Sequence, residues 1–131
     1  MIGVDTNVLI RLLTADIDDQ HQLAVGVFGS LSADEPAFLS AVTLAETVWV
    51  LRRSYGFTAS EIGEAIELLL EREDLEIEGR ESLMLLFESG FRSGQIADHL
   101  IAHLGKRAGC IRTVTFDRRA AKAVPGMELL A

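Results

Sequence analysis

The chain has 131 residues, the usual size of one domain, and 49% of them are hydrophobic, so it has enough apolar residues for a buried core. A single cysteine excludes an internal disulfide framework and a cysteine-rich zinc module. The net charge of −8 argues against a protein that coats nucleic acid through bulk electrostatics, although residues 99–131 carry six bases and only two acids. The sequence has no secretory signal pattern and no apolar run near the ~20 residues of a membrane helix, so we expect a soluble, cytoplasmic protein.

Short apolar runs alternate with helical patterns along the whole chain. In chain order, the first part predicts a buried strand over 2–5, a helix from Thr6 to Leu13, a helix over 18–31, a strand over 37–39 and a helix over 41–55. The second part predicts a helix from Thr58 or Ser60 to Arg72, a strand over 75–78, helices over 80–92 and 96–108, a buried strand over 113–116, a short helix after Asp117 and a strand over 127–130. Strands separated by helices indicate an α/β fold with a mostly parallel sheet.

Two features of this pattern make specific predictions. Thr6 and Ser40 are placed to cap the helices that follow them. The helix over 41–55 is expected to bury a stripe that includes the apolar residues Val42 and Trp49. Ligands of open α/β sheets bind beyond the carboxyl ends of the strands, so Asp5 and Asp117 are expected at the same edge of the sheet.

Four acids stand in apolar or uncharged local surroundings: Asp5, Glu46, Asp98 and Asp117. Two carboxylates ~4 Å apart repel by roughly 4 kcal/mol at an effective dielectric near 20, so a group of them would take up protons or hold a cation. Oxygen ligands favour Mg²⁺ or Mn²⁺, which polarises a phosphoryl oxygen and activates a water. Each acid also has an ordinary interpretation, as a helix cap, a helix-dipole acid or a solvated helix residue.

These acids fall in four motifs that follow one another from the start of the chain to near its end: IGVDTNVLIRLL, SAVTLAETVWVL, IADHLIAHLGKRAGC and TVTFDRRAAK. In these motifs the sequence resembles PIN-domain ribonucleases, in particular the VapC-type toxins of bacterial toxin–antitoxin pairs. The resemblance implies one PIN domain over residues 1–131, with a central, mostly parallel sheet of four to five strands flanked by helices. It also implies an Mg²⁺- or Mn²⁺-dependent endoribonuclease that hydrolyses RNA phosphodiester bonds with a metal-activated water.

The resemblance carries roles over to particular positions. Asp5, Glu46, Asp98 and Asp117 would be the catalytic, metal-binding acids. Three polar residues would support them: Asn7, Thr115 and Thr6. Four further residues are candidate substrate contacts, with solvated surface charge as the competing interpretation of the arginines: Arg11, His99, Arg118 and Arg119. The expected partners are an RNA substrate, a VapB-like antitoxin and a second copy of the chain, with no membrane.

The sequence departs from the family pattern at two positions. Gln95 replaces a further acid found in many relatives, and His99 stands where relatives usually have a small or apolar residue. The main alternative is a catalytically silent PIN-like module that binds RNA or protein, which the absence of metal binding would favour. A phosphatase that uses Asp5 as a covalent nucleophile is a weaker alternative, because the haloacid-dehalogenase type has an aspartate where this chain has Asn7.

Overall fold

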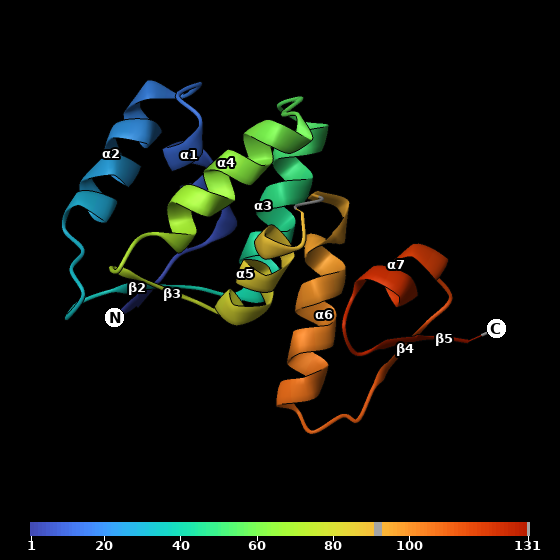
Figure 1. Cartoon of the computed structure of the whole chain (residues 1–131). Coiled ribbons are helices and arrows are strands. Elements are labelled where there is room, and N and C mark those ends of the chain that lie inside the picture. Colours follow the sequence, from blue (N-terminus) through green and yellow to red (C-terminus); the bar gives the residue numbers. More distant parts are fainter. Residues whose placement is uncertain (91–92, 131) are drawn as a thin grey trace. The chain divides into compact units, whose positions relative to one another are not determined.

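The structure is a computed structural model that describes residues 1–90 and 93–130 (Figure 1). The chain divides into two compact units, Met1–Glu78 and Gly79–Ala131. Each unit combines helices with parallel strands, which confirms the predicted mixed α/β fold. In the described part of the chain, no helix combines the length and apolar character that crossing a membrane requires.

The first unit contains a three-stranded parallel sheet in the order β1-β2-β3. Its elements are β1 (Ile2–Gly3), α1 (Thr6–Leu13), α2 (Asp18–Gly29), β2 (Ala37–Leu39), α3 (Ala41–Arg53), α4 (Ala59–Leu70) and β3 (Leu75–Ile77). In β2, Ala37 lies opposite Ile2 on one side and Leu75 on the other. Helix α1 packs against both α2 and α3 (Figure 1). The largest fully buried apolar side chains of this unit come from α1, β2, α3 and α4: Leu9, Leu39, Leu44, Leu51, Ile62 and Ile66.

The starts of α1, α3 and α4 follow from short-range hydrogen bonds. Ser40 caps α3 as predicted, because its hydroxyl accepts from the backbone N–H of Thr43 at 3.1 Å. Thr58 and Glu61 form a reciprocal capping box at the start of α4. The predicted cap at Thr6 is wrong: Asp5 is the N-cap of α1, and Thr6 is the first residue of the helix. Asp5 takes this role because its backbone is extended and its carboxylate accepts from the next N–H.

The second unit contains a two-stranded parallel sheet, β4-β5. Its elements are α5 (Arg80–Glu88), a short 3-10 helix (Ser93–Gln95), α6 (Ile96–Arg107), β4 (Thr113–Thr115), α7 (Arg118–Ala123) and β5 (Met127–Leu129). Helix α5 packs against α6, and Ala102, Ala120 and Val124 form a buried cluster with Met127 beside it. The helix predicted over 80–92 ends earlier, at Glu88, and its positions 91–92 lie outside the described residues.

Two strands predicted to be buried are exposed instead. Both residues of β1 are exposed, and β4 is followed by Phe116, of which 82% is exposed. The physical reason is their position: β1 is an edge strand of its sheet, and β4 has a neighbour on one side only. All strands of the described residues pair in parallel, as predicted, and they divide into sheets of three and two strands. The predicted common sheet edge for Asp5 and Asp117 stays a prediction.

The buried face of α3 also differs from the predicted stripe. Val42 and Trp49 are exposed, Trp49 by 59%, whereas the hydroxyl-bearing Thr43 and Thr47 are buried. Trp49 lies beneath the guanidinium of Arg53, 5.5 Å from the ring centroid. Threonine is compatible with a helix core because its methyl group packs like that of valine. Hydropathy alone did not separate the exposed Val42 and Trp49 from the buried face.

Candidate active site

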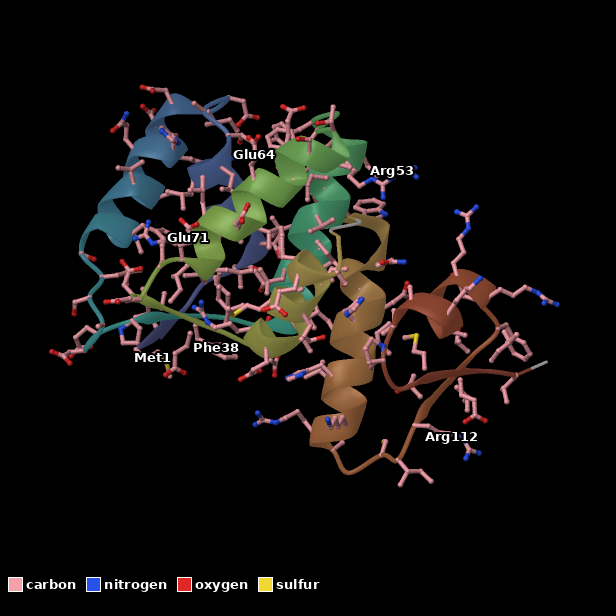
Figure 2. All side chains as sticks on the ribbon, viewed as in Figure 1. Met1, Phe38, Arg53, Glu64, Glu71 and Arg112 are labelled. Carbon is pink, nitrogen blue, oxygen red and sulfur yellow. The ribbon has the colours of Figure 1, made fainter. Side chains whose placement is uncertain are left out.

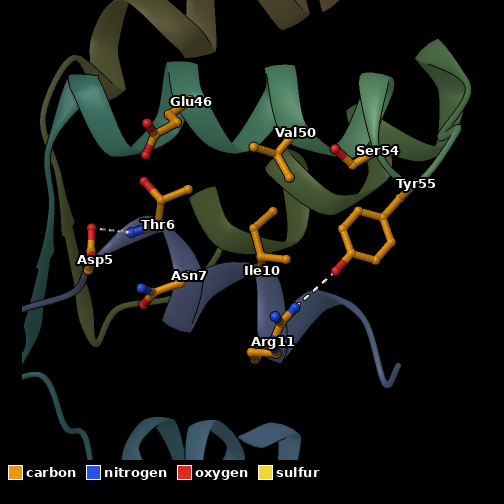
Figure 3. A pocket seen from close by; sticks show the side chains of 9 residues that line it. All are labelled: Asp5, Thr6, Asn7, Ile10, Arg11, Glu46, Val50, Ser54 and Tyr55. Atoms are coloured by element: carbon orange, nitrogen blue, oxygen red, sulfur yellow. Dashed lines mark hydrogen bonds between the residues drawn. The ribbon is translucent and has the colours of Figure 1, made fainter. Parts of the chain in front are cut away.

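A pocket of about 340 Å³ lies between α1 and α3 in the first unit (Figure 3). Its walls come from both helices, from the residue before α1 and from the two residues after α3: Asp5, Thr6, Asn7, Ile10, Arg11, Glu46, Val50, Ser54 and Tyr55. The two ends differ in chemistry. Carboxylate, amide and hydroxyl groups gather around the start of α1, whereas a guanidinium and a phenol lie at the other end (Figure 3).

At the acidic end, Asp5 is oriented by the start of α1. Its Oδ1 accepts from the backbone N–H of Thr6 at 2.8 Å. An ordinary N-cap accepts from the second or third N–H of the helix, so Asp5 satisfies fewer helical donors than a purely structural cap. Its second carboxylate oxygen has no hydrogen-bond partner among the described residues, and the side chain is exposed at the pocket. Asp5 is therefore open to a ligand.

Glu46 reaches the same pocket from α3. It shares one face of the helix with Val50 and Ser54, four and eight residues later, and all three line the pocket. Figure 3 shows its carboxylate on the same side as Thr6 and Asp5. Other glutamates, such as Glu64 and Glu71 at α4, are exposed and do not line this pocket (Figure 2).

At the opposite end, Arg11 is held by a hydrogen-bond network. Its Nε donates to Gln20 Oε1 at 2.7 Å, and its Nη1 donates to the hydroxyl of Tyr55 at 2.9 Å. The Tyr55 hydroxyl in turn donates to Asp16 at 2.8 Å, and this hydrogen bond is the main reason that the pKa of Asp16 lies below its ordinary value. The pocket thus has a cation fixed at one end and carboxylates at the other.

The second unit brings the other two predicted acids near one another. Asp98 lies in the first turn of α6, and burial raises the pKa of its carboxyl, with the charge of Asp117 raising it further and His99 opposing the shift. Asp117 caps α7: its Oδ1 accepts from the N–H groups of Arg119 and Ala120 at 2.8 and 3.0 Å. The hydroxyl of Thr115 accepts from the N–H of Asp117 at 3.0 Å and so orients it, as a supporting residue would.

His99 is buried, with 4% of it exposed, and burial lowers the pKa of its imidazole. Its Nε2 has no hydrogen-bond partner among the described residues. Arg118 and Arg119 are exposed at the start of α7. Substrate contact by these three residues stays a prediction. The described residues contain no group of three or more His, Cys, Asp or Glu side chains able to hold a metal ion. Asp5 and Glu46 lie in the first unit, and Asp98 and Asp117 lie in the second.

Residues 2–125 match the family model described as PIN domain. The chain belongs to the PIN-domain family. The PIN domain is also similar to the crystal structure of Mycobacterium tuberculosis VapC20, described as a toxin that cleaves the sarcin-ricin loop. The identity is 20%, the match covers 94% of this chain and 95% of that one, and the TM-score is 0.47. No curated protein matches this PIN domain significantly in sequence.

The sequence analysis singled out Asp5, Glu46 and Arg11, which line this pocket, but it missed two other residues of the pocket wall. Ser54 and Tyr55 were not singled out, although the spacing of Glu46, Val50 and Ser54 marks one helix face. Arg11 and Tyr55 are 44 positions apart in the sequence, so no local sequence pattern predicts the hydrogen bond between them.

Proposed function

We propose that this PIN domain is an Mg²⁺- or Mn²⁺-dependent endoribonuclease that acts as the toxin of a toxin–antitoxin pair. The observation that carries the proposal is the meeting of Asp5 and Glu46 in one pocket, in a chain that belongs to the PIN-domain family. The proposed catalytic and metal-binding acids are Asp5, Glu46, Asp98 and Asp117, with Asn7, Thr6 and Thr115 as supporting residues.

The chemistry of these groups fits a hard divalent cation. All four acids offer carboxylate oxygens, and none of them forms an ion pair with a lysine or arginine in the described part of the chain. Asp98 is the clearest case, because burial and the nearby charge of Asp117 both disfavour its ionised form. A bound cation would relieve both effects, since it compensates the charge that burial and repulsion penalise.

Each group of the proposed site would have a separate role in hydrolysis. A bound ion would neutralise charge on the scissile phosphate and make a water acidic enough to attack at neutral pH. The carboxylates would orient that water by accepting its hydrogen bonds, and Asn7, which lines the acidic end, would donate to a phosphate oxygen. Thr115 would keep Asp117 in place through the hydrogen bond described above.

The proposal also includes partners. The substrate is RNA, a VapB-like antitoxin silences the enzyme, and the active form is a homodimer, as the family resemblance implies. His99, Arg118 and Arg119 are proposed as additional substrate contacts. The predicted cytoplasmic location belongs to the same proposal.

The test is cleavage of total cellular RNA by the purified protein. Discrete fragments are expected with Mg²⁺ or Mn²⁺ and none with EDTA. Asp5→Asn and Asp98→Asn, one from each unit, should each reduce the rate by about a hundredfold or more, because each removes a carboxylate that stabilises the reacting charge. Asp34→Asn, at an exposed position in the loop before β2, is the matched control and should cleave like the wild type.

Circular dichroism of each variant shows whether the fold is retained. Full cleavage by both folded variants would contradict the assignment of the acids. If the wild type binds the metal but leaves RNA intact after removal of any bound antitoxin, the ribonuclease proposal fails. Absence of both metal binding and cleavage would instead favour the silent binding module.

A further inference from the structure

Arg11 retains hydrogen-bonding capacity at the pocket. Its Nε and Nη1 are committed to Gln20 and Tyr55, whereas its Nη2 donates to no group among the described residues. A guanidinium has five N–H donors in a fixed plane, so a residue anchored on one side still presents a donor pair on the other. The hydroxyl of Ser54, which also lines the pocket, likewise has no hydrogen-bond partner among the described residues.

The position of Arg11 is fixed rather than free. Gln20 and Tyr55 hold the guanidinium, and only 22% of the side chain is exposed. Arg11 follows Asp5 by six residues, which corresponds to about 9 Å along the axis of α1. Ile10 and Val50 line the pocket between the two ends (Figure 3). The basic end is therefore a separate polar site from the acidic end, joined to it by an apolar wall.

We propose that Arg11, on the α1 side of the pocket, binds a backbone phosphate of the RNA strand next to the phosphate held at the acidic end, with Ser54 of the facing wall as a further donor. A fixed guanidinium suits this task, because it binds phosphate through two parallel hydrogen bonds. The side chains of Tyr55 and Gln20 act as positioning residues that hold the guanidinium. This inference rests on the proposed function and names the part of the pocket that binds the rest of the substrate.

Asp16 makes it possible to distinguish phosphate binding by Arg11 from a purely structural role of Arg11. One carboxylate oxygen of Asp16 lies 3.6 Å from Arg11 Nη1, and the other accepts from Tyr55. If Arg11 serves only to hold the fold together, loss of Asp16 and loss of Arg11 damage the same network and act in the same direction. If Arg11 binds phosphate, they act in opposite directions, because Asp16 repels the anion that Arg11 attracts.

The experiment measures the Kd of a fluorescent single-stranded RNA of mixed sequence by anisotropy, in EDTA and over a range of KCl concentrations. The proteins are the wild type and four variants: Arg11→Gln, Arg11→Lys, Asp16→Asn and Arg112→Gln. Arg112, which is half exposed and paired with Glu128 in the second unit, provides the matched loss of one positive charge. Thermal melting identifies any variant that has lost its fold.

Arg11→Gln should weaken binding by about tenfold, the effect of one lost charged hydrogen bond. It should also lower the slope of log K against log salt by about 0.7, which corresponds to one phosphate contact on a single strand. Arg11→Lys should keep the slope but bind more weakly than the wild type, since lysine lacks the planar donor pair. Asp16→Asn should tighten binding, by roughly threefold, and Arg112→Gln should leave it unchanged.

Equal Kd and salt slope for folded Arg11→Gln and wild type would overturn the inference. So would weaker binding by Asp16→Asn, or no RNA binding by the wild type. Cleavage of total RNA is scored separately, so the two proposals fail differently. Arg11-dependent binding without cleavage would retain the phosphate site and reject the nuclease, and cleavage without an Arg11 effect on binding would do the reverse.

Discussion

Asp98 carries a negative charge that its surroundings in the folded chain disfavour. Burial is the main reason that the pKa of its carboxyl is raised, and the charge of Asp117 adds to it. Groups whose ionised form is disfavoured in this way concentrate at functional sites, because the function and not the fold requires the charge. For the metal-free protein, this arrangement lowers stability at neutral pH.

The consequence at the scale of one residue is that Asp98→Asn should raise the Tm of the protein in EDTA at neutral pH. The pKa of Asp98 is higher in the folded chain than in the unfolded chain, so the folded state binds the proton more tightly. The free energy of unfolding of the wild type therefore falls as the pH rises from the ordinary pKa of aspartate through the raised pKa of Asp98. Asparagine does not ionise. The variant should therefore have a higher Tm than the wild type at pH values above the raised pKa of Asp98, and this difference should vanish below the ordinary pKa of aspartate.

Thermal melting of both proteins between acidic and neutral pH checks this prediction. Asp34→Asn, at an exposed loop position, should show no comparable pH-dependent gain. A lower Tm for Asp98→Asn at neutral pH in EDTA would mean that the Asp98 carboxylate stabilises the fold. This result would contradict the prediction that its negative charge destabilises the metal-free protein.

Individual site residues differ in how far the sequence could predict them. The four acids stood out because carboxylates are rare in apolar local sequence unless they are paired or bind a ligand. Tyr55 did not stand out, because its partners Arg11 and Asp16 are distant in the sequence. Trp49 was expected to be buried and is exposed, since hydropathy reports the type of residue and not the face of the molecule on which it lies.

Gly79 shows how one element constrains another. It is the N-cap of α5 with a φ of +83°, and a Cβ at this position would lie 2.5 Å from Cδ2 of Leu100, which is buried on α6. Gly109, which follows α6, also has a positive φ of +98°, but a Cβ there would meet nothing within 4 Å. The two glycines therefore share the backbone requirement and differ only in the space around them.

At the scale of elements, Gly109→Ala should reduce the free energy of unfolding by about 1 kcal/mol, the cost of a left-handed backbone for a residue with a Cβ. Gly79→Ala should cost about 1–3 kcal/mol more, because its Cβ also displaces a packed leucine. Urea unfolding of both variants measures the difference. Equal losses would show that α5 and α6 can move apart without penalty at this contact.

The elements themselves were largely predictable from short-range signals. Ser40 and Thr58 fix the starts of α3 and α4 through hydrogen bonds within three residues, so the sequence predicts them well. Helix ends were less accurate: α2, predicted to residue 31, ends at Gly29. The last turn of a helix has no strong side-chain signal unless a glycine or proline stops it.

Charge is unevenly divided over the whole molecule. Residues 1–78 carry 15 acids and 4 bases, whereas residues 79–131 carry 5 acids and 8 bases. A strongly acidic first unit would repel RNA at long range, and a cation at the acidic end of the pocket would reduce that repulsion locally. The proposed metal would therefore assist binding of the polyanion as well as hydrolysis.

Metal binding should stabilise the whole protein, because a ligand that binds only the folded state increases the free energy of unfolding. At a Mn²⁺ concentration about a hundredfold above Kd, the expected gain is about 2.7 kcal/mol, seen as a higher Tm and reversed by EDTA. Glu46→Gln should reduce this gain. Glu64→Gln, on the exposed face of α4, should respond to Mn²⁺ like the wild type.

The result that counts against metal binding is a wild-type Tm that does not change with Mn²⁺ or Mg²⁺. An equal rise in Tm for the wild type and Glu46→Gln would instead place the ion elsewhere. Because melting does not require RNA, this test is independent of whether the correct substrate has been found.

The sequence by itself determined the alternation of strands and helices, the main caps and the four acids, because each depends on local spacing and on residue chemistry. Only the tertiary structure decided that Asp5 and Glu46 share a pocket and that Tyr55 holds Arg11 at its other end. It also decided that β1 and the residues after β4 are exposed. These features depend on which distant segments pack together, and an apolar run has the same local pattern at the edge of a sheet as at its centre.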